Sequence, residues 1–340
     1  MVERAMIGTL DLKHAVIQAP MAGTSTPALA AAVCEAGGLG SVALGALDVS
    51  AAAKAIAQTA ALTGQPFAVN LFCHAPARRD PRREAAWLER LRPEFQRFGA
   101  EPPATLSEIY QSFRVNDPML RLLIDLRPQV ISFHFGLPEA AQLQALRGTG
   151  AVLLATATSL PEGRAIAAAG LDGIVAQGWQ AGGHRGTFDP EAADARLDTL
   201  ALVRQLAGIG LPLIAAGAIM TRDDARAAIA AGAVAVQCGT AFLQAPEAAT
   251  SAAHRAAMAS GETVITRAIS GRLARGMANR FTAIDGADAP DYPVAYDAGK
   301  ALNAAALATG ETGWGAFWAG TGAAQAVARP AAQTVAALSP

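Results

Sequence analysis

Short apolar segments alternate with Ala-rich helical stretches along most of the chain, and this alternation constrains the fold more than any other feature. Each segment is four to six residues long, nearly all apolar and bounded by turn residues. Strands of this kind are buried on both faces, as in a parallel sheet covered by helices such as those predicted over residues 26–36 and 222–231. Eight strands are predicted, over residues 16–19, 40–44, 67–71, 130–135, 152–155, 173–177, 213–216 and 234–237.

Eight strand-helix units in succession predict an α/β fold, a (β/α)8 TIM barrel. An open, doubly wound sheet is the alternative. It fits less well because the units number eight and no Gly-x-Gly-x-x-Gly motif opens a helix after the first strand. The glycine run over residues 37–40 follows a predicted helix and precedes a strand, so we interpret it as a helix end and a tight turn.

Two segments are longer than the usual connections between the strands of a barrel. Residues 72–129 separate the third and fourth strands, and residues 245–340 follow the eighth. A segment that follows a strand leaves the barrel from the C-terminal ends of the strands, where barrels bind their ligands. We therefore expect residues 1–71 and 130–244 to form the cofactor-binding barrel, and the two long segments to form a smaller helical cap domain for the substrate.

The composition limits the possible partners. A formal net charge of -1 argues against a nucleic-acid or membrane surface, and 52% hydrophobic residues with 16% charged residues indicate a packed globular protein. Cys34, Cys73 and Cys238 are odd in number and lack metal-ligand spacing, which favours a reducing compartment without bound metal. Residues 1–6 show no signal-peptide pattern, so a cytoplasmic protein is predicted, as a monomer or homodimer.

The loops after the seventh and eighth strands predict a phosphate site. Gly217 follows the seventh strand, and Gly239 and Thr240 follow the eighth. Barrels commonly bind phosphate at these two loops through backbone N–H groups, without a lysine or arginine. The alternative is that these glycines only turn the chain.

Amide side chains stand at or near the ends of several predicted strands. Asn70, Gln177 and Gln237, together with Gln18, could supply donors and acceptors to a flat polar heterocycle, although each amide alone could be structural. A phosphate joined to such a ring fits flavin mononucleotide (FMN). It fits a nicotinamide dinucleotide less well, because no dinucleotide fingerprint is visible.

A glycine-rich loop with one histidine follows the sixth strand. Gly182, Gly183 and Gly186 let the backbone adopt positive φ and approach a ligand closely, and His184 stands between them. The ordinary pKa of histidine suits proton transfer at neutral pH, so His184 is the candidate base, with a structural histidine as the alternative.

Together these motifs resemble the nitronate monooxygenases, formerly called 2-nitropropane dioxygenases, of the bacterial class I type. The resemblance spans nearly the whole chain, whereas Gly-Gly-His-x-Gly alone is shared with flavin-dependent enoyl reductases. The matching segments are residues 17–27 (IQAPMAGTSTP), 36–40 (AGGLG), 69–70 (VN), 131–138 (ISFHFGLP), 182–186 (GGHRG), 215–217 (AAG) and 236–240 (VQCGT).

The resemblance implies a barrel with noncovalent FMN and a histidine base, which is His184 here. It also implies an enzyme that oxidises nitronates with dioxygen to a carbonyl compound and nitrite, as a detoxification reaction. Neutral nitroalkanes, where accepted, first lose their α-proton to the histidine. The FMN contacts implied by the resemblance are Gln18, Met21, Asn70, Gln177, Gly182, Gly217, Gln237, Cys238, Gly239 and Thr240.

The three tyrosines of the chain all lie in the two long segments. Tyr110 lies in the first, and Tyr292 and Tyr296 lie in the second, where Lys300 follows Tyr296 at helical i, i+4 spacing. Similar tyrosines and a lysine line the substrate pocket of class I nitronate monooxygenases. The resemblance therefore implies that these four residues bind the substrate, with Lys300 holding a nitronate or a carboxylate such as that of propionate 3-nitronate.

Several points stay open. Family members often have Met at the position of Cys238 and Glu at that of Gln180, and His134 could face the pocket or be structural. The segment over residues 317–320 resembles a family motif and is interpreted as helix packing. The alternative functions are a nicotinamide-dependent flavin reductase acting on an enoyl thioester or quinone, and a noncatalytic phosphate- or flavin-binding barrel.

Overall fold

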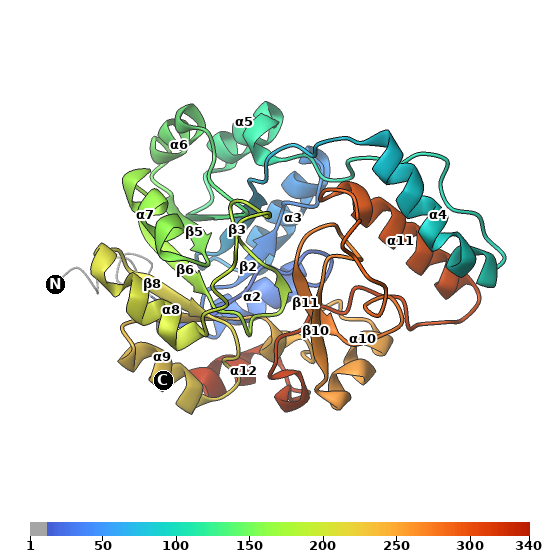
Figure 1. Ribbon diagram of the computed structural model, residues 1–340. Coiled ribbons are helices and arrows are strands. Elements are labelled where there is room, and N and C mark those ends of the chain that lie inside the picture. The colour runs from blue at the N-terminus through green and yellow to red at the C-terminus, as the bar shows by residue number, and fades with distance from the viewer. Residues whose placement is uncertain (1–11) are drawn as a thin grey trace.

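Eight parallel strands form the centre of the computed structural model, which describes residues 12–340 (Figure 1). The sheet order is β1-β9-β8-β6-β5-β4-β3-β2, and a bridge between Ile17 and Leu39 links its two edges. The predicted TIM barrel is confirmed, and each strand lies within two residues of its predicted range. The strands are β1 (Val16–Gln18), β2 (Ser41–Ala43), β3 (Ala68–Phe72), β4 (Val130–His134), β5 (Val152–Ala157), β6 (Gly173–Gln177), β8 (Leu213–Ala216) and β9 (Ala235–Cys238).

Helices surround the barrel, and their starts are encoded locally. Thr26 caps α2 by accepting a hydrogen bond from the Leu29 N–H, and Pro27 occupies the first turn, where no backbone donor is needed. The helix ends at Glu35, and Gly37, two residues later, has a φ of +86°, which confirms the predicted turn. The surrounding helices are α2 (Pro27–Glu35), α3 (Val49–Leu62), α5 (Asp117–Leu126), α6 (Ala140–Arg147), α7 (Leu160–Ala168), α8 (Thr199–Leu206), α9 (Arg222–Ala230) and α12 (Ala331–Leu338).

The side-chain alternation of the strands decides which residues face the inside of the barrel. In β6, Ile174 and Ala176 pack outward against the helices, whereas Val175 packs in the barrel interior. Because successive side chains point to opposite faces, Gln177 shares the inner face with Val175. Asn70 and Gln237 occupy the equivalent inner positions of β3 and β9, at or near the C-terminal ends of the strands.

A second hydrophobic core lies beside the barrel, built from the two long segments. Helices α4 (Pro81–Arg97) and α11 (Val294–Ala308) lie side by side, with Trp87 and Phe95 of α4 sharing a buried cluster with Leu302 of α11 (Figure 1). Arg83 at the start of α4 also pairs with Asp291 at 3.3 Å. We call this unit, together with the strands and loops of residues 263–290 that complete its core, the cap.

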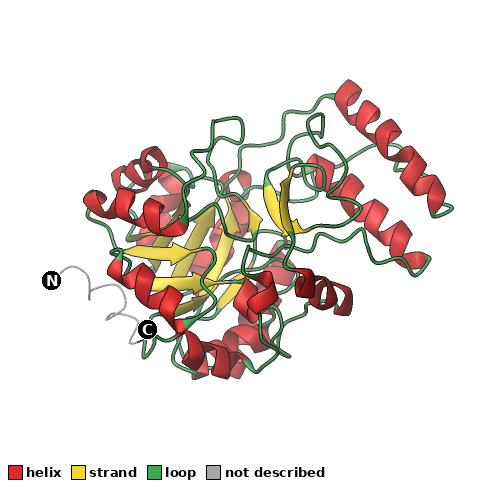
Figure 2. Cartoon of the chain, turned by 60° about the horizontal axis from the view of Figure 1, so that its bottom comes forward, coloured by secondary structure: helices red, strands yellow, loops and turns green. Residues whose placement is uncertain are grey.

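The cap carries a small antiparallel sheet beside the barrel (Figure 2). Its strands are β10 (Thr263–Thr266), β11 (Ala274–Met277) and β7 (Gly183–His184). Strand β7 belongs to the histidine loop that follows β6, and His184 pairs with Ala274 of β11. The histidine loop is therefore held by the barrel at its start and by the cap sheet at Gly183 and His184.

Two helices within the long segments pack on the barrel rather than in the cap. Met119 and Leu123 of α5 lie in the barrel core, and α5 packs against α3 and α6. Helix α12 packs against α2 and α9, with Val335 buried among them. The predicted cap boundaries at 72–129 and 245–340 are therefore too wide, because each long segment ends by supplying a helix that covers the barrel.

The remaining short elements connect these parts. They are α10 (Ala252–Ala257) and the 3-10 helices η1 (Phe113–Val115), η2 (Ala207–Ile209), η3 (Thr240–Phe242), η4 (Met258–Ser260) and η5 (Ala323–Gln325). Across residues 12–340, no helix has the length and apolar character needed to cross a membrane. Residues 1–6, on which the signal-peptide prediction was made, lie outside the described residues.

Candidate active site

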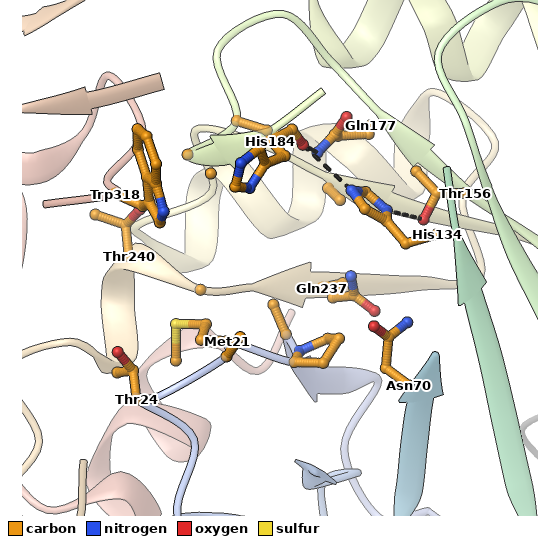
Figure 3. Close-up of a pocket in the computed structure, with 18 of the residues that line it drawn as sticks. Met21, Thr24, Asn70, His134, Thr156, Gln177, His184, Gln237, Thr240 and Trp318 are labelled. Atoms are coloured by element: carbon orange, nitrogen blue, oxygen red, sulfur yellow. Dashed lines mark hydrogen bonds between the residues drawn. The ribbon is translucent and has the colours of Figure 1, made fainter. Parts of the chain in front are cut away.

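A cavity of about 500 Å³ lies at the C-terminal ends of the barrel strands, between the barrel and the cap. In Figure 3, His184 and Trp318 lie on one side of it and Met21 on the other, with Gln237 and Asn70 at its edge. The structure brings nearly all of the predicted site residues to this cavity. Those that line it are Met21, Asn70, Tyr110, Gln177, Gly182, His184, Gly217, Gln237, Cys238, Gly239, Thr240, Tyr292, Tyr296 and Lys300.

Gln18 is the one predicted site residue that does not line the cavity. Its side chain is fully buried, where Nε2 donates to Ser25 Oγ at 2.8 Å and Oε1 accepts from the Ser41 N–H at 2.9 Å. Alternation along β1 explains this position, because Ile17 packs in the barrel interior and its neighbour must point outward. Gln18 therefore ties β1 to β2 and to the loop that follows β1.

The amides of Asn70 and Gln177 are oriented by their hydrogen bonds. Asn70 Nδ2 donates to Ser132 Oγ at 2.9 Å and to Ser132 O at 3.2 Å, which leaves its carbonyl oxygen free to accept. Gln177 Oε1 accepts from the Gly186 N–H at 2.8 Å, and Nε2 donates one hydrogen to His184 O at 2.9 Å. Asn70 thus offers an acceptor and Gln177 a donor at the cavity edge.

Arg185 holds the loop that carries Gln177 and His184. It is 1% exposed and pairs with Asp194 at 2.8 Å, and its Nη1 donates to Gln177 O at 2.9 Å and to Gln177 Oε1 at 3.3 Å. A buried charge is stable only when it is paired and hydrogen-bonded. This ion pair therefore fixes the end of β6 and the direction of the Gln177 amide.

The loops after β8 and β9 form the other end of the cavity. Gly217 has φ +123°, and a Cβ there would lie 2.8 Å from Thr199 Oγ1 and 3.0 Å from the Ala181 nitrogen. Only glycine fits such a position without displacing its neighbours. Lys300, from the cap, is the only lysine or arginine among the described residues that line the cavity. A phosphate at Gly217, Gly239 and Thr240 would therefore be held by backbone N–H groups.

Cys238 lines the cavity but its thiol belongs to the barrel wall. Its side chain packs in the same core as Val236, on the outer face of β9, whereas Gln237 between them points inward. Burial raises the pKa of the Cys238 thiol to about 12. The thiol is therefore an inert packing group, and only its backbone is suited to contact a ligand.

His184 presents one free ring nitrogen. Its Nε2 lies 2.9 Å from Ser270 Oγ, and that hydroxyl in turn donates to Arg272 O at 3.2 Å. Since the hydroxyl proton is engaged by the carbonyl, Nε2 carries the proton in its bond to Ser270. The Nδ1 nitrogen bonds to no residue in the described chain. Enclosure lowers the pKa of His184 to about 3, with His134 and Arg272 adding to the effect, so the ring is neutral.

His134 also lines the cavity, yet both of its nitrogens are engaged. Its Nε2 donates to His184 O at 3.2 Å, and its Nδ1 accepts from Thr156 Oγ1 at 3.0 Å (Figure 3). Burial lowers its pKa to about 3, so the ring is uncharged. His134 therefore positions the backbone of His184, in agreement with the structural interpretation of this residue.

Three tyrosines and Lys300 line the cap side. The Tyr110 ring lies 6.3 Å from that of Tyr292 and 5.9 Å from that of Tyr296, and the His184 ring lies 5.3 Å from Tyr292. Lys300 Nζ lies 4.8 Å from the centre of the Tyr110 ring. Burial raises the pKa of each tyrosine, to about 12 for Tyr110, so the hydroxyls stay protonated and can donate.

Several site residues escaped the sequence predictions. The Trp318 ring lies 5.1 Å from that of His184, and its Nε1 donates to the Tyr296 hydroxyl at 3.3 Å, although its segment was interpreted as helix packing. The backbones of Gly182 and Gly320 approach so closely that a Cβ on either would clash with the other segment. The 317–320 motif was a usable signal for Trp318. Ser270 and Arg272 stand in no recognisable pattern.

Comparison with known proteins places this geometry in a family. The family model described as nitronate monooxygenase matches residues 3–340. A nitronate monooxygenase of Paraburkholderia phytofirmans is 53% identical, with 99% of this chain and 94% of that protein covered. One of Pseudomonas aeruginosa is 49% identical, with 97% and 96% covered. The solved structure of nitroalkane oxidase from Streptomyces ansochromogenes superposes with a TM-score of 0.90 at 37% identity, covering 96% of this chain and 95% of that one.

Proposed function

The chain belongs to the nitronate monooxygenase family and is an oxidoreductase, and we propose that it oxidises alkyl nitronates with FMN and dioxygen to a carbonyl compound and nitrite. One observation carries the proposal. A neutral histidine with a free Nδ1 stands in a cavity that is also lined by Gly217, Gly239 and Thr240, and by a lysine with three tyrosines. The same features would serve a cytoplasmic detoxification of propionate 3-nitronate.

The barrel side of the cavity fits FMN. The free oxygen of Asn70, the remaining N–H of Gln177 and the Gln237 amide can bond to the polar edge of the flavin ring, and backbone N–H groups at Gly217 can bond to the phosphate. Met21 and Gly182 would border the ring, and Gly239 and Thr240 the phosphate. When bound, FMN supplies an electron acceptor that dioxygen can reoxidise.

His184 is proposed to act as the base for neutral nitroalkanes. The Ser270 hydroxyl keeps the proton on Nε2, so the lone pair of Nδ1 is available to take the α-proton of the substrate. His134 holds the same residue through its carbonyl group. A preformed nitronate has already lost this proton, so for that substrate His184 only lines the binding site.

The cap is proposed to bind the substrate. The Tyr110, Tyr292 and Tyr296 hydroxyls can donate to the nitro oxygens, and Lys300, which has no carboxylate partner in the described chain, can pair with a substrate carboxylate. Partial burial lowers the pKa of Lys300. Asp297, one turn earlier on α11, opposes this by favouring the charged form of Lys300. Propionate 3-nitronate carries both a nitronate group, which the tyrosines could bind, and a carboxylate, which Lys300 could bind.

The test is aerobic turnover of propionate 3-nitronate by the FMN-loaded protein, with and without NADPH. We expect oxygen uptake and nitrite release at a rate that NADPH does not change. Anaerobic bleaching of the flavin by NADPH, without nitrite release from the nitronate, would instead favour the flavin reductase. A purified protein that binds no FMN would remove the cofactor assignment.

A further inference from the structure

Arg272 is a buried arginine without a carboxylate partner. It is 3% exposed, and its guanidinium contacts Thr187 O, Thr187 Oγ1 at 3.3 Å and Arg185 O at 3.4 Å. No Asp or Glu of residues 12–340 forms a salt bridge with it, in contrast to Arg185, which pairs with Asp194. Burial lowers the pKa of Arg272 to about 10, so it still carries its charge at neutral pH. Glu162 and Asp189 favour its charged form only from beyond salt-bridge distance. A buried charge without a direct partner is costly, which indicates a role outside folding.

The charge lies behind one aromatic ring of the cavity wall. Arg272 Cζ lies 4.3 Å from the centre of the Phe135 ring, and that ring lies 5.8 Å from His184 and 5.2 Å from Tyr292. Phe135 has φ +72°, a rare conformation for a residue other than glycine, and such strain is typical of functional sites. Phe135 therefore separates Arg272 from the place where His184 and Tyr292 meet.

The field of Arg272 reaches the groups around this place. Its charge lowers the pKa of His184, His134 and His74, and it favours the ionised form of Tyr292. Of the cations in residues 12–340, Arg272 lowers the pKa of His184, whereas Lys300 lies beside Tyr110 and Tyr296. The titratable and polar groups that face His184 from the elements packed around it are His134, Ser270, Tyr292, Tyr296 and Trp318.

A positive field at this point acts differently on the two forms of the substrate. A nitronate is an anion, so the field stabilises it as soon as it binds. A neutral nitroalkane gains nothing on binding. Its proton transfer to His184 then creates a nitronate and an imidazolium together. The field stabilises the first and destabilises the second, so its two effects oppose each other.

We propose that Arg272 makes the site selective for the anionic nitronate over its conjugate nitroalkane. This inference rests on the proposed function. Arg272 acts through Phe135 without touching the substrate, so it is a residue that determines specificity and not a catalytic residue. Its role is separate from the proposed role of Lys300, which lies beside Tyr110 and would pair with a substrate carboxylate.

The test compares ethylnitronate with nitroethane, which differ by one proton and carry no carboxylate for Lys300. For Arg272→Gln, which keeps a donor for Thr187 O but loses the charge, we expect kcat/KM for ethylnitronate to fall about tenfold, mainly through KM. The value for nitroethane should change less than about threefold. Arg272→Lys should keep the wild-type ratio of the two values, because it keeps the charge.

The control is Arg275→Gln. Arg275 is also buried without a carboxylate partner in the described chain, but it bonds to Trp179 O at 3.0 Å and Thr263 Oγ1 at 3.2 Å, and its charge does not reach His184. We expect this variant to keep the wild-type ratio of kcat/KM for ethylnitronate to kcat/KM for nitroethane. Where the Arg272→Gln protein is unstable, Arg272→Met fills the space beside Phe135 and serves the same comparison.

The results separate the inference from the proposed function. Nitrite release from ethylnitronate by the wild-type protein tests the proposed function alone. An equal loss of kcat/KM on both substrates in Arg272→Gln would show that Arg272 has only a structural role. A fall of the ratio in Arg275→Gln as large as that in Arg272→Gln would also overturn the inference.

Discussion

The two sides of the cavity are built in different ways. On the barrel side, Asn70, Gln177 and Gln237 stand at or near strand ends, where the sheet itself sets their direction. On the cap side, Tyr110 comes from one long segment and Tyr292, Tyr296 and Lys300 from another, and a separate hydrophobic core brings them together. The histidine loop belongs to both sides, since His184 follows β6 and also pairs with β11.

This difference suggests a division of tasks. A sheet gives a rigid frame, which suits a cofactor that stays in place through every turnover. A cap with its own core can vary in sequence without disturbing the barrel, which suits a substrate wall. A change confined to one side should therefore alter the task of that side and leave the other task unaffected.

The largest effect is expected where the two sides meet. His184→Asn should lower the turnover of nitroethane by roughly 100-fold or more, because it removes the proton acceptor. Turnover of ethylnitronate should fall far less, and FMN affinity should stay the same. Stopped-flow reduction of the flavin by each substrate measures the difference. His14→Asn is the control, since His14 bonds to Ser339 away from the cavity; equal losses on both substrates in His184→Asn would refute the base assignment.

A change on the barrel side should weaken the cofactor. In Gly217→Ala, the new methyl group would meet Thr199 Oγ1 and Ala181 in a backbone conformation that alanine rarely adopts. We expect FMN to bind about tenfold more weakly by fluorescence titration, with KM values unchanged once the protein is saturated. Gly208→Ala is the matched control, because its Cβ would meet nothing within 4 Å. Unaltered FMN affinity in Gly217→Ala would place the phosphate elsewhere.

A change on the cap side should affect one class of substrate. Lys300→Met should raise KM for propionate 3-nitronate by about fivefold to tenfold, because the carboxylate loses its cation. KM for ethylnitronate, which has no carboxylate, should change by less than about twofold. Steady-state oxygen uptake measures both values. A similar rise for the two nitronates would mean that Lys300 binds the nitro group instead.

The smallest effect is expected from pH. The pKa of His184 is lowered to about 3, so the neutral base persists well below the range where an ordinary histidine is protonated. Between pH 8 and pH 5, kcat for nitroethane should therefore fall less than about twofold, whereas an unperturbed histidine would lose more than about tenfold. Rates from the FMN-saturated enzyme give the profile. A midpoint near pH 6.5 would show that enclosure does not act on His184 as inferred.

Sequence and structure agree best where local patterns are strong. Eight apolar strands with turn residues between them predicted the barrel, and position at a strand end predicted Asn70, Gln177 and the His184 loop. Gln18 shows the limit of this reasoning. It lies next to Ile17 in a strand buried on both faces, so the apolar pattern does not reveal which side faces inward.

The cap shows a second limit. Its tyrosines and Lys300 were identified by family resemblance and by their place in the two long segments, and spacing linked only Tyr296 to Lys300. Helices α5 and α12 were assigned to the cap because their segments were too long, yet they pack on the barrel. Local sequence marks a helix but does not state which core its apolar face joins.

The sequence by itself determined the barrel, the glycine turns of the predicted phosphate site and the histidine that follows the sixth strand, because each depends on neighbouring residues. Only the tertiary structure decided which ring nitrogen of His184 carries the proton and which charged residue lies behind the cavity wall. Ser270 and Arg272 reach the histidine loop from 86 and 87 residues away. Such contacts depend on how the cap sheet pairs with the loop, and hydrogen bonds and fields of this kind leave no periodic pattern in the chain.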